Sequence, residues 1–121
     1  MTRLDHLLFA TQDVDATVED LAKRLGVTAA PGGQHPAWGT RNALLSLGPR
    51  RYLEIIGPDG ERPPPLEARP AGIDTLRTAR LTDWAATSTD LAHDVARARQ
   101  AGMELGNPQT GSRRRADGSL L

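Results

Sequence analysis

The first apolar residues of the chain fall into one short run and then recur at helical spacing. Residues 4–10 form an apolar run that is too short for a helix and predicts a buried strand. Asp13 then occupies an N-cap position before five apolar residues with helical spacing, which are Val14, Val18, Leu21, Ala22 and Leu25. Lys23 and Arg24 close this helix and Gly26 stops it, an order of charge that suits the helix dipole. The pattern predicts a strand followed by a helix.

Turn-forming residues divide the next stretch of sequence. Residues 31–42 are rich in glycine and proline and predict a short strand and a loop. Residues 42–47 and 51–56 predict two strands that the turn at 48–50 joins into a hairpin. Prolines then dominate residues 58–73, and because they lack a backbone donor and favour extended geometry, this segment is predicted to be a linker across the surface.

The pattern of the N-terminal region returns after this linker. Residues 81–87 predict a strand, Asp90 takes the next N-cap position, and Gly102 stops the helix. The stripe of this second helix that we expect to be buried consists of Leu91, Val95 and Ala98. Asp13 corresponds to Asp90 and Gly26 to Gly102, so the same strand–cap–helix–glycine unit occurs twice. These elements predict an α+β fold.

The last residues predict a hairpin whose second strand has barely begun. Residues 111–115 and 119–121 would flank a turn at 116–118. If the second half repeats the first, its last strand is absent, and an open sheet edge is a template for pairing with another chain. We therefore expect either a fragment of a longer protein or a homodimer in which a second copy covers the edge.

Length and composition exclude several classes of protein and of functional site. With 121 residues there is room for one domain with one core. Acidic and basic residues balance at 15 each, which argues against nucleic-acid binding. The absence of cysteine excludes a disulfide, a thiolate metal site and a thiol nucleophile. Because the sequence shows neither a signal-peptide pattern nor a long apolar run, we expect a cytoplasmic protein that does not enter membranes.

Two strand residues are candidates for metal chemistry, each with a structural alternative. His6 shares a strand face with Leu4 and Leu8, so it is either a metal ligand or a half-buried histidine bonded to a backbone carbonyl. Glu54 shares a face with Tyr52 and Ile56, and a carboxylate between apolar neighbours costs free energy unless it is paired or metal-bound. Its alternative is a salt bridge to an arginine.

The loop between the predicted strands supplies further candidates. His35 precedes Pro36 and is either a pocket acid–base group near neutral pH or a loop histidine packed on Trp38. Asn42 either faces a pocket or caps a turn. The arginines at 113–115 either clamp an anionic substrate or form a solvated face. Trp84 is expected to pack in the core, and His93 to lie on the surface.

Several short motifs, in this order, resemble the glyoxalase-like branch of the vicinal-oxygen-chelate superfamily, which includes glyoxalases, bleomycin-resistance proteins and dioxygenases. They are Leu4-Asp5-His6-Leu7, Gly33-Gln34-His35 with Gly39-Thr40-Arg41-Asn42, and Arg51-Tyr52-Leu53-Glu54-Ile55-Ile56. The resemblance implies paired βαβββ modules whose curved mixed sheet surrounds a concave pocket. It divides the chain into a first module at 1–57, the linker at 58–73 and a partial second module at 74–121.

The resemblance also implies a site and a set of functions. Family enzymes hold a divalent metal with ligands from the first and fourth strands of each module, which suggests His6 and Glu54 as ligands of Zn, Fe, Mn or Ni. His35 is then the catalytic acid–base candidate, and Trp38, Asn42 and Tyr52 are the substrate-pocket candidates. At the counterpart of His6, Asp83 stands where family enzymes commonly have histidine, and the last strand of the second module is missing.

The predicted function is binding of a small oxygen-rich or carbonyl compound, and the candidate activities are those of a metal-dependent lyase, isomerase or dioxygenase. The alternatives are a metal-free, non-catalytic protein that binds small molecules of the antibiotic type, and an inactive truncated domain. Fold alone does not decide among these.

Overall fold

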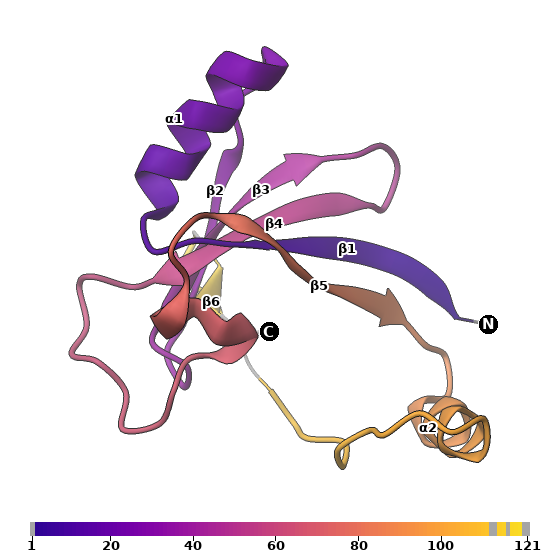
Figure 1. The fold of residues 1–121 in the computed structure, drawn as a ribbon. Coiled ribbons are helices and arrows are strands. Elements are labelled where there is room, and N and C mark those ends of the chain that lie inside the picture. Colours follow the sequence, from indigo (N-terminus) through magenta and orange to yellow (C-terminus); the bar gives the residue numbers. More distant parts are fainter. Residues whose placement is uncertain (1, 112–113, 116, 120–121) are drawn as a thin grey trace.

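The protein has an α+β fold (Figure 1). Its structure is a computed structural model, which describes residues 2–111, 114–115 and 117–119. Its elements, in chain order, are β1 (Arg3–Ala10), α1 (Val14–Leu25), β2 (Ala30–His35), β3 (Thr40–Ser46), β4 (Tyr52–Pro58), the 3₁₀ helix η1 (Pro70–Thr75), β5 (Arg80–Thr87), α2 (Leu91–Gln100) and the two-residue β6 (Arg114–Arg115). The predicted succession of strands and helices up to α2 is confirmed.

The strands form one open mixed sheet. Its five main strands lie in the order β5-β1-β4-β3-β2, and β6 is added beside β2. The β1–β4 pair is parallel, whereas β5 runs antiparallel to β1, and β3 runs antiparallel to both β4 and β2. The segment from β1 to β4 is therefore one βαβββ module, in which α1 connects β1 to β2, and β4 and β3 lie between these two strands in the sheet. In the β1–β4 register His6 is opposite Tyr52, and Leu8 is opposite Glu54.

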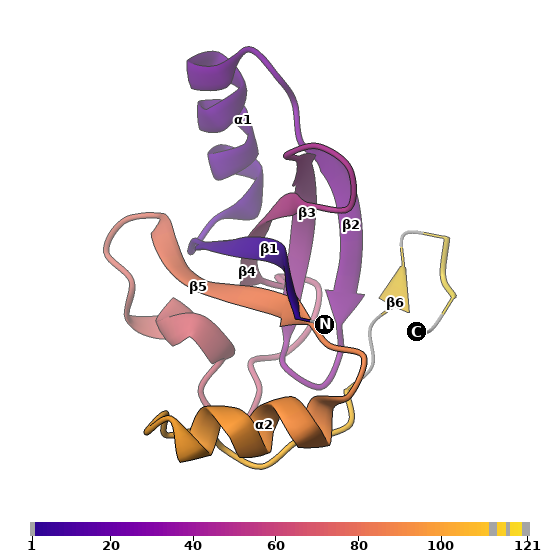
Figure 2. The same ribbon diagram turned by 90° about the vertical axis from the view of Figure 1, so that its right-hand side faces the viewer.

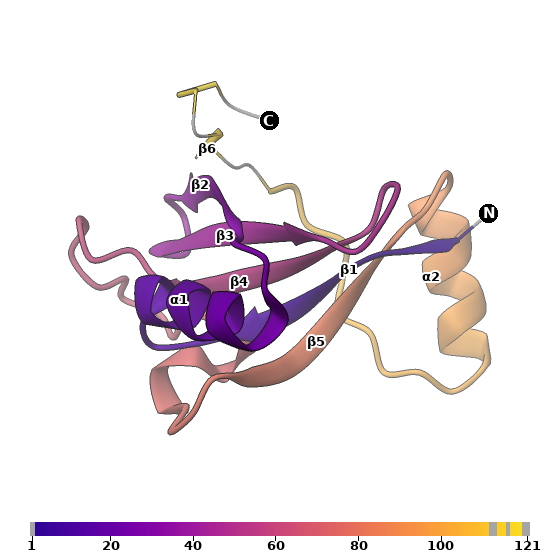
Figure 3. The same ribbon diagram turned by 90° about the horizontal axis from the view of Figure 1, so that it is seen from above.

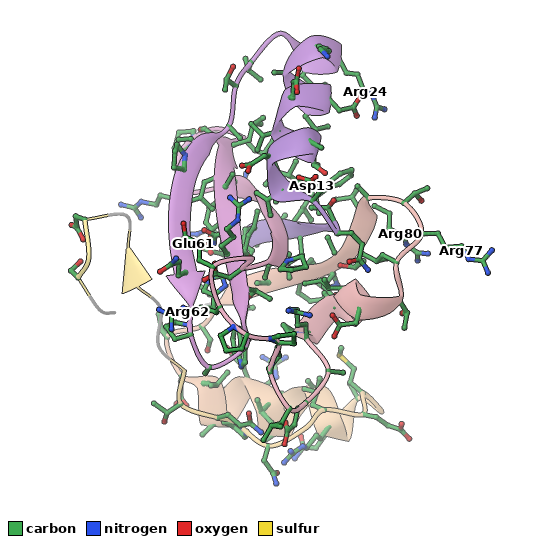
Figure 4. The ribbon with its side chains drawn as sticks, turned by 90° about the vertical axis from the view of Figure 1, so that its left-hand side faces the viewer. Asp13, Arg24, Glu61, Arg62, Arg77 and Arg80 are labelled. Carbon is green, nitrogen blue, oxygen red and sulfur yellow. The ribbon has the colours of Figure 1, made fainter. Side chains whose placement is uncertain are left out.

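Local signals in the sequence account for α1. Asp13 caps it by accepting a hydrogen bond from the backbone N–H of Ala16, and Gly26 ends it in the left-handed region at φ 74°. Apolar residues of α1 pack on one face of the sheet in a core of Val14, Leu21, Ala29, Ala43, Leu45, Leu53 and Ile55. Figures 2 and 3 show α1 on this face, and Figure 4 shows Asp13 at its base and Arg24 pointing outward near its end.

The proline-rich segment is tied to the sheet at two places. Ile73 of η1 is fully buried beside Ala10 and Ile56, in a second apolar cluster. Arg69 donates through Nε to the carbonyl of Gly39 at 3.0 Å. Gly39 has φ 61°, and a Cβ there would lie 2.9 Å from Cδ of Pro65, so only glycine allows this close approach. The predicted linker is thus a packed connection for part of its length.

Asp74 fastens the end of this connection. Its carboxylate accepts hydrogen bonds from the backbone N–H of Arg69 at 2.8 Å and from the Arg69 guanidinium at 2.6 Å. These bonds, the backbone one first, lower the pKa of Asp74 below its ordinary value. The Arg69–Asp74 pair therefore links the residue before η1 to a residue near its end, next to the turn that contains Gly39.

The second helix forms where it is predicted but does not pack as predicted. Asp90 caps α2 by accepting from the backbone N–H of His93, and His93 is exposed as expected. The expectation that Trp84 and the stripe of Leu91, Val95 and Ala98 are buried is wrong: none of the residues of α2 is buried, and Leu91 and Trp84 are 54% and 64% exposed. α2 lies apart from α1 at the far end of β5, where no described strand provides a sheet face beneath it (Figures 1 and 3).

The predicted C-terminal hairpin lies partly outside the described residues, namely at 112–113, 116 and 120–121. The described part includes β6, whose Arg115 and Arg114 pair with Gly33 and Gln34 of β2. Among the helices that the structure describes, none is both long enough and apolar enough to span a membrane.

Candidate functional site

A cavity of about 490 Å³ lies on the sheet face opposite α1. This placement follows from strand alternation, since Leu7 and Leu53 pack toward α1 while their neighbours His6 and Glu54 face the other side. The lining residues come from β1, β2, β4, β5 and the connections, and they are His6, Leu8, His35, Trp38, Tyr52, Glu54, Ile56, Pro70, Ala85 and Gly111. Five of the six predicted site residues therefore meet at one cavity.

A second cavity, of about 380 Å³, lies between α1 and the segment before β5. Its lining includes Asp13, Arg24 and Arg77, which Figure 4 labels, and none of the predicted site residues. The chemistry of the candidate site is therefore sought at the first cavity.

His6 is held from three sides. Its Nδ1 lies 2.8 Å from Oδ2 of Asp5, and its Nε2 lies 3.2 Å from Oε2 of Glu54. The ring stacks on Tyr52 with centroids 4.6 Å apart and an interplanar angle of 13°. His6 thus has carboxylates at both ring nitrogens, where the structural alternative expected a backbone carbonyl.

Glu54 is buried at the floor of the cavity, with an exposed fraction of 7%. Asn42 donates through Nδ2 to Oε1 of Glu54 at 2.8 Å, and Nε2 of His35 lies 3.8 Å from the same oxygen. Together with His6 at Oε2, these contacts surround the carboxylate with an amide and two imidazoles. The ion pairs described for Glu54 involve these histidines, whereas the structural alternative expected an arginine.

Of the lining residues, His35 is buried and Trp38 is half-exposed. The Nδ1 atom of His35 lies 2.9 Å from the Thr40 hydroxyl, and its Nε2 lies 3.4 Å from Nδ2 of Asn42. The His35 and Trp38 rings are 5.8 Å apart and tilted by 54°, so the predicted packing of the two rings is present. Asn42 is itself buried and is not among the lining residues of the cavity.

Sequence reasoning missed Asp5 and Thr40, which bond to the two histidines. Asp5 adjoins His6 in the chain, but strand alternation assigns it to the opposite face, so only the folded geometry reveals the contact. Thr40 is fully buried at the start of β3, and its place next to His35 depends on the turn that joins β2 to β3.

The remaining metal candidates do not join His6 and Glu54. Asp83 is opposite Leu8 in the β1–β5 register, but it is exposed and lines a different, polar cavity near η1. Of the three arginines, Arg113 lies outside the described residues, and only the backbone of Arg114 and Arg115 is described. Within the described part of the chain, no group of three or more His, Cys, Asp and Glu side chains is placed to hold a metal ion.

Comparisons with known proteins agree with the fold. A family described as "Glyoxalase-like domain" matches residues 4–121. A variant of Streptomyces coelicolor methylmalonyl-CoA epimerase in complex with 2-nitronate-propionyl-CoA is 26% identical, with 93% of this chain and 82% of that chain covered and a TM-score of 0.63.

Two further solved structures resemble the chain. Methylmalonyl-CoA epimerase from Mycobacterium tuberculosis is 24% identical, with 97% of this chain and 83% of that chain covered and a TM-score of 0.64. A hypothetical protein from Bacillus halodurans C-125 is 18% identical, with 98% and 90% covered and a TM-score of 0.69. No curated protein matches the chain.

Proposed function

Because this chain belongs to the glyoxalase-like domain family, we propose that it binds a small carbonyl or oxygen-rich compound in the cavity over His6 and Glu54. We further propose that these two side chains are ligands of a divalent metal ion. The cavity that both residues line supports the first statement, and the observation that carries the metal assignment is the 3.2 Å separation of His6 Nε2 and Glu54 Oε2. Two ligands of one ion with bonds of about 2.1 Å are separated by roughly 3.0–3.4 Å.

The neighbours of the pair fit this role. Asp5 at Nδ1 of His6 is the carboxylate that commonly orients a metal-binding imidazole and leaves Nε2 for the ion. Asn42 occupies Oε1 of Glu54, so Oε2 is the oxygen left next to His6. A divalent ion at this place would supply Lewis-acid polarisation of a substrate carbonyl.

The other residues of the cavity have roles in binding and proton transfer. Trp38 and Tyr52 form aromatic walls that orient an apolar substrate body and exclude water. The Glu54 carboxylate and the His35 imidazole are the groups that would accept or return a proton beside a polarised carbonyl. The acid–base role of His35 and the metal role of His6 and Glu54 remain predictions.

The segment from β5 to α2 is interpreted as the start of a second module. When Asp13 is aligned with Asp90, Leu7 corresponds to Trp84, and these two residues are direct partners in the β1–β5 register. A two-fold relationship between the two halves would therefore pass through this pair. This supports further ligands from a partner copy, in addition to His6 and Glu54.

The test is elemental analysis of the purified protein, followed by calorimetric titration of Mn²⁺, Fe²⁺, Ni²⁺ and Zn²⁺ into a sample treated with chelator. Wild type is expected to bind one of these ions stoichiometrically, and both His6→Ala and Glu54→Gln are expected to lose that binding. His93→Ala, which changes an exposed histidine on α2, is the matched control. Unchanged binding in both site variants, or no binding in wild type, overturns the metal assignment.

A second candidate function is binding of an apolar small molecule without a metal. The observation in its favour is the lining of the cavity, where Leu8, Ile56, Pro70 and Ala85 accompany the two aromatic walls. A volume of about 490 Å³ suits a drug-sized ligand. Binding of such a ligand with chelator present, lost in Trp38→Ala, would favour it. Because solved relatives hold acyl-CoA compounds, methylmalonyl-CoA belongs in the same ligand panel.

A further inference from the structure

The β2–β3 pair contains an irregularity directly beside the site. Pro31 is opposite Ala43 and Gln34 is opposite Arg41, so Gly32 and Gly33 together face the single residue Asn42. Two residues facing one is the arrangement of a β-bulge, a feature that re-aims side chains next to functional sites. Here the residue at the bulge is an asparagine whose side chain is buried.

The bulge fixes the orientation of the Asn42 amide. The backbone N–H of Gly33 donates to Oδ1 of Asn42 at 2.7 Å, and a backbone N–H is always a donor, so the oxygen and nitrogen of this amide are assigned without ambiguity. A Cβ on Gly32 would lie 2.0 Å from Oδ1 of Asn42. Glycine at position 32 is therefore needed for the amide to sit against the β2 backbone.

With its oxygen turned toward β2, Asn42 presents both amide hydrogens to the site. One is donated to Oε1 of Glu54 at 2.8 Å, and the other points to Nε2 of His35 at 3.4 Å. An imidazole nitrogen that receives a hydrogen bond carries no proton, so a bond from Asn42 to Nε2 requires the proton of a neutral His35 ring to be on Nδ1, the nitrogen that lies 2.9 Å from the Thr40 hydroxyl. One side chain thus constrains both the carboxylate and the second histidine.

We propose that Asn42, seated by the Gly32–Gly33 bulge, is a positioning residue that holds Glu54 and fixes the Nδ1-protonated tautomer of His35. This rests on the proposed function in so far as Glu54 is the group that meets the metal or the ligand. By occupying Oε1, Asn42 directs Oε2 toward His6 and the cavity. By donating to Nε2 of His35, it prevents that imidazole from competing for Glu54 as a hydrogen-bond donor.

The experiment is long-range ¹⁵N–¹H NMR of the imidazole rings in the full chain, combined with Mn²⁺ titration. Wild type is expected to show His35 as the Nδ1–H tautomer. Asn42→Asp keeps the size of the side chain and an oxygen for the Gly33 N–H but removes both donors, so the His35 proton is expected on Nε2. Mn²⁺ affinity is expected to fall by roughly 10- to 100-fold, as for loss of an outer-shell partner. Asn107→Asp, an exposed position, is the matched control.

The outcomes separate this inference from the proposed function. An Nε2–H tautomer of His35 in the wild-type protein overturns the inference without any variant. An unchanged His35 spectrum in both Asn42→Asp and Gly32→Ala also overturns it, and Gly32→Ala covers the case in which the aspartate variant does not fold. Absence of Mn²⁺ binding by wild type overturns the metal assignment alone, because the tautomer measurement does not depend on the ion.

Discussion

His6 and Glu54 lie on the neighbouring parallel strands β1 and β4 but are not register partners. Their 3.2 Å contact joins diagonal neighbours on the two strands. His6 is opposite Tyr52, and its ring stacks on that residue, whereas Glu54 is opposite Leu8. This diagonal arrangement places the His6 imidazole and the Glu54 carboxylate side by side in the lining of a largely apolar cavity. It also leaves Tyr52 to stack on His6 and Asn42 to bond to Glu54.

The first prediction concerns Asp5, whose carboxylate lies at Nδ1 of His6. Asp5→Asn is expected to reduce Mn²⁺ affinity by roughly 10- to 100-fold, because the imidazole loses the charged partner that fixes its orientation. Calorimetric titration measures the change. Asp20→Asn, at an exposed position of α1, is the control and is expected to leave the affinity unchanged. Equal affinities for Asp5→Asn and wild type would show that Asp5 does not orient His6.

The second prediction concerns Ile73, which anchors the proline-rich segment in the apolar cluster with Ala10 and Ile56. Ile73→Ala is expected to lower the free energy of unfolding by about 2–4 kcal/mol, since it removes buried methyl groups and leaves a cavity. Leu66→Ala changes a fully exposed residue of the same segment and is expected to cost less than about 0.5 kcal/mol. Urea denaturation compares them, and equal stability of the two variants would contradict the packed connection.

The third prediction is a pH dependence of stability at the Arg69–Asp74 contact. The bonds from Arg69 lower the pKa of Asp74 in the folded state, so this carboxylate contributes stability above its unfolded pKa and loses that contribution as pH falls through the folded pKa. Asp74→Asn is therefore expected to have a lower Tm than wild type at neutral pH, with the difference shrinking below about pH 4. Thermal unfolding from pH 2 to 7 measures this.

The control for that experiment is Glu67→Gln, an exposed carboxyl of the same segment. Its Tm difference from wild type is expected to stay small throughout the range, because exposed charges contribute little to stability. A Tm difference for Asp74→Asn that stays constant down to pH 2 would mean that the lost packing or hydrogen-bond geometry, rather than the charge, accounts for the effect.

The fourth prediction is that the chain forms a homodimer. β5 is at the end of the sheet, with β1 as its described neighbour, and Trp84 and Leu81 on this strand are exposed. An edge strand with exposed apolar side chains favours pairing with a second copy. Light scattering is expected to give about twice the chain mass of 13.0 kDa at high concentration. A monomer over the whole accessible concentration range would contradict this.

Local sequence signals were sufficient to predict most of the helices and strands of the fold. The Asp13 cap and the Gly26 stop act within one or two turns of the chain, and the structure places both where the sequence predicts them. The same holds for the Asp90 cap of α2. The family resemblance, carried by the segments around His6, Thr40 and Glu54, is likewise confirmed by the family match.

Burial in the second half was not predictable in the same way. The spacing of Leu91, Val95 and Ala98 predicts an amphipathic helix, but a stripe is buried only if another element lies against it. No described strand lies beneath α2, so Leu91 stays exposed, as does Trp84 on β5. Helix formation is decided largely by near neighbours in sequence, whereas packing needs a partner surface from elsewhere in the chain.

The sequence by itself determined most of the strands, both α-helices with their caps, and the strand faces of His6 and Glu54, because period and caps are local properties; it did not determine η1, which lies in the segment predicted as a linker. Only the tertiary structure decided how those side chains meet. The β1–β4 register brings His6 to Glu54, and the Gly32–Gly33 bulge turns Asn42 toward both Glu54 and His35. Register and bulges arise from pairing between distant segments, and a shift of one residue would send each of these side chains to the opposite face.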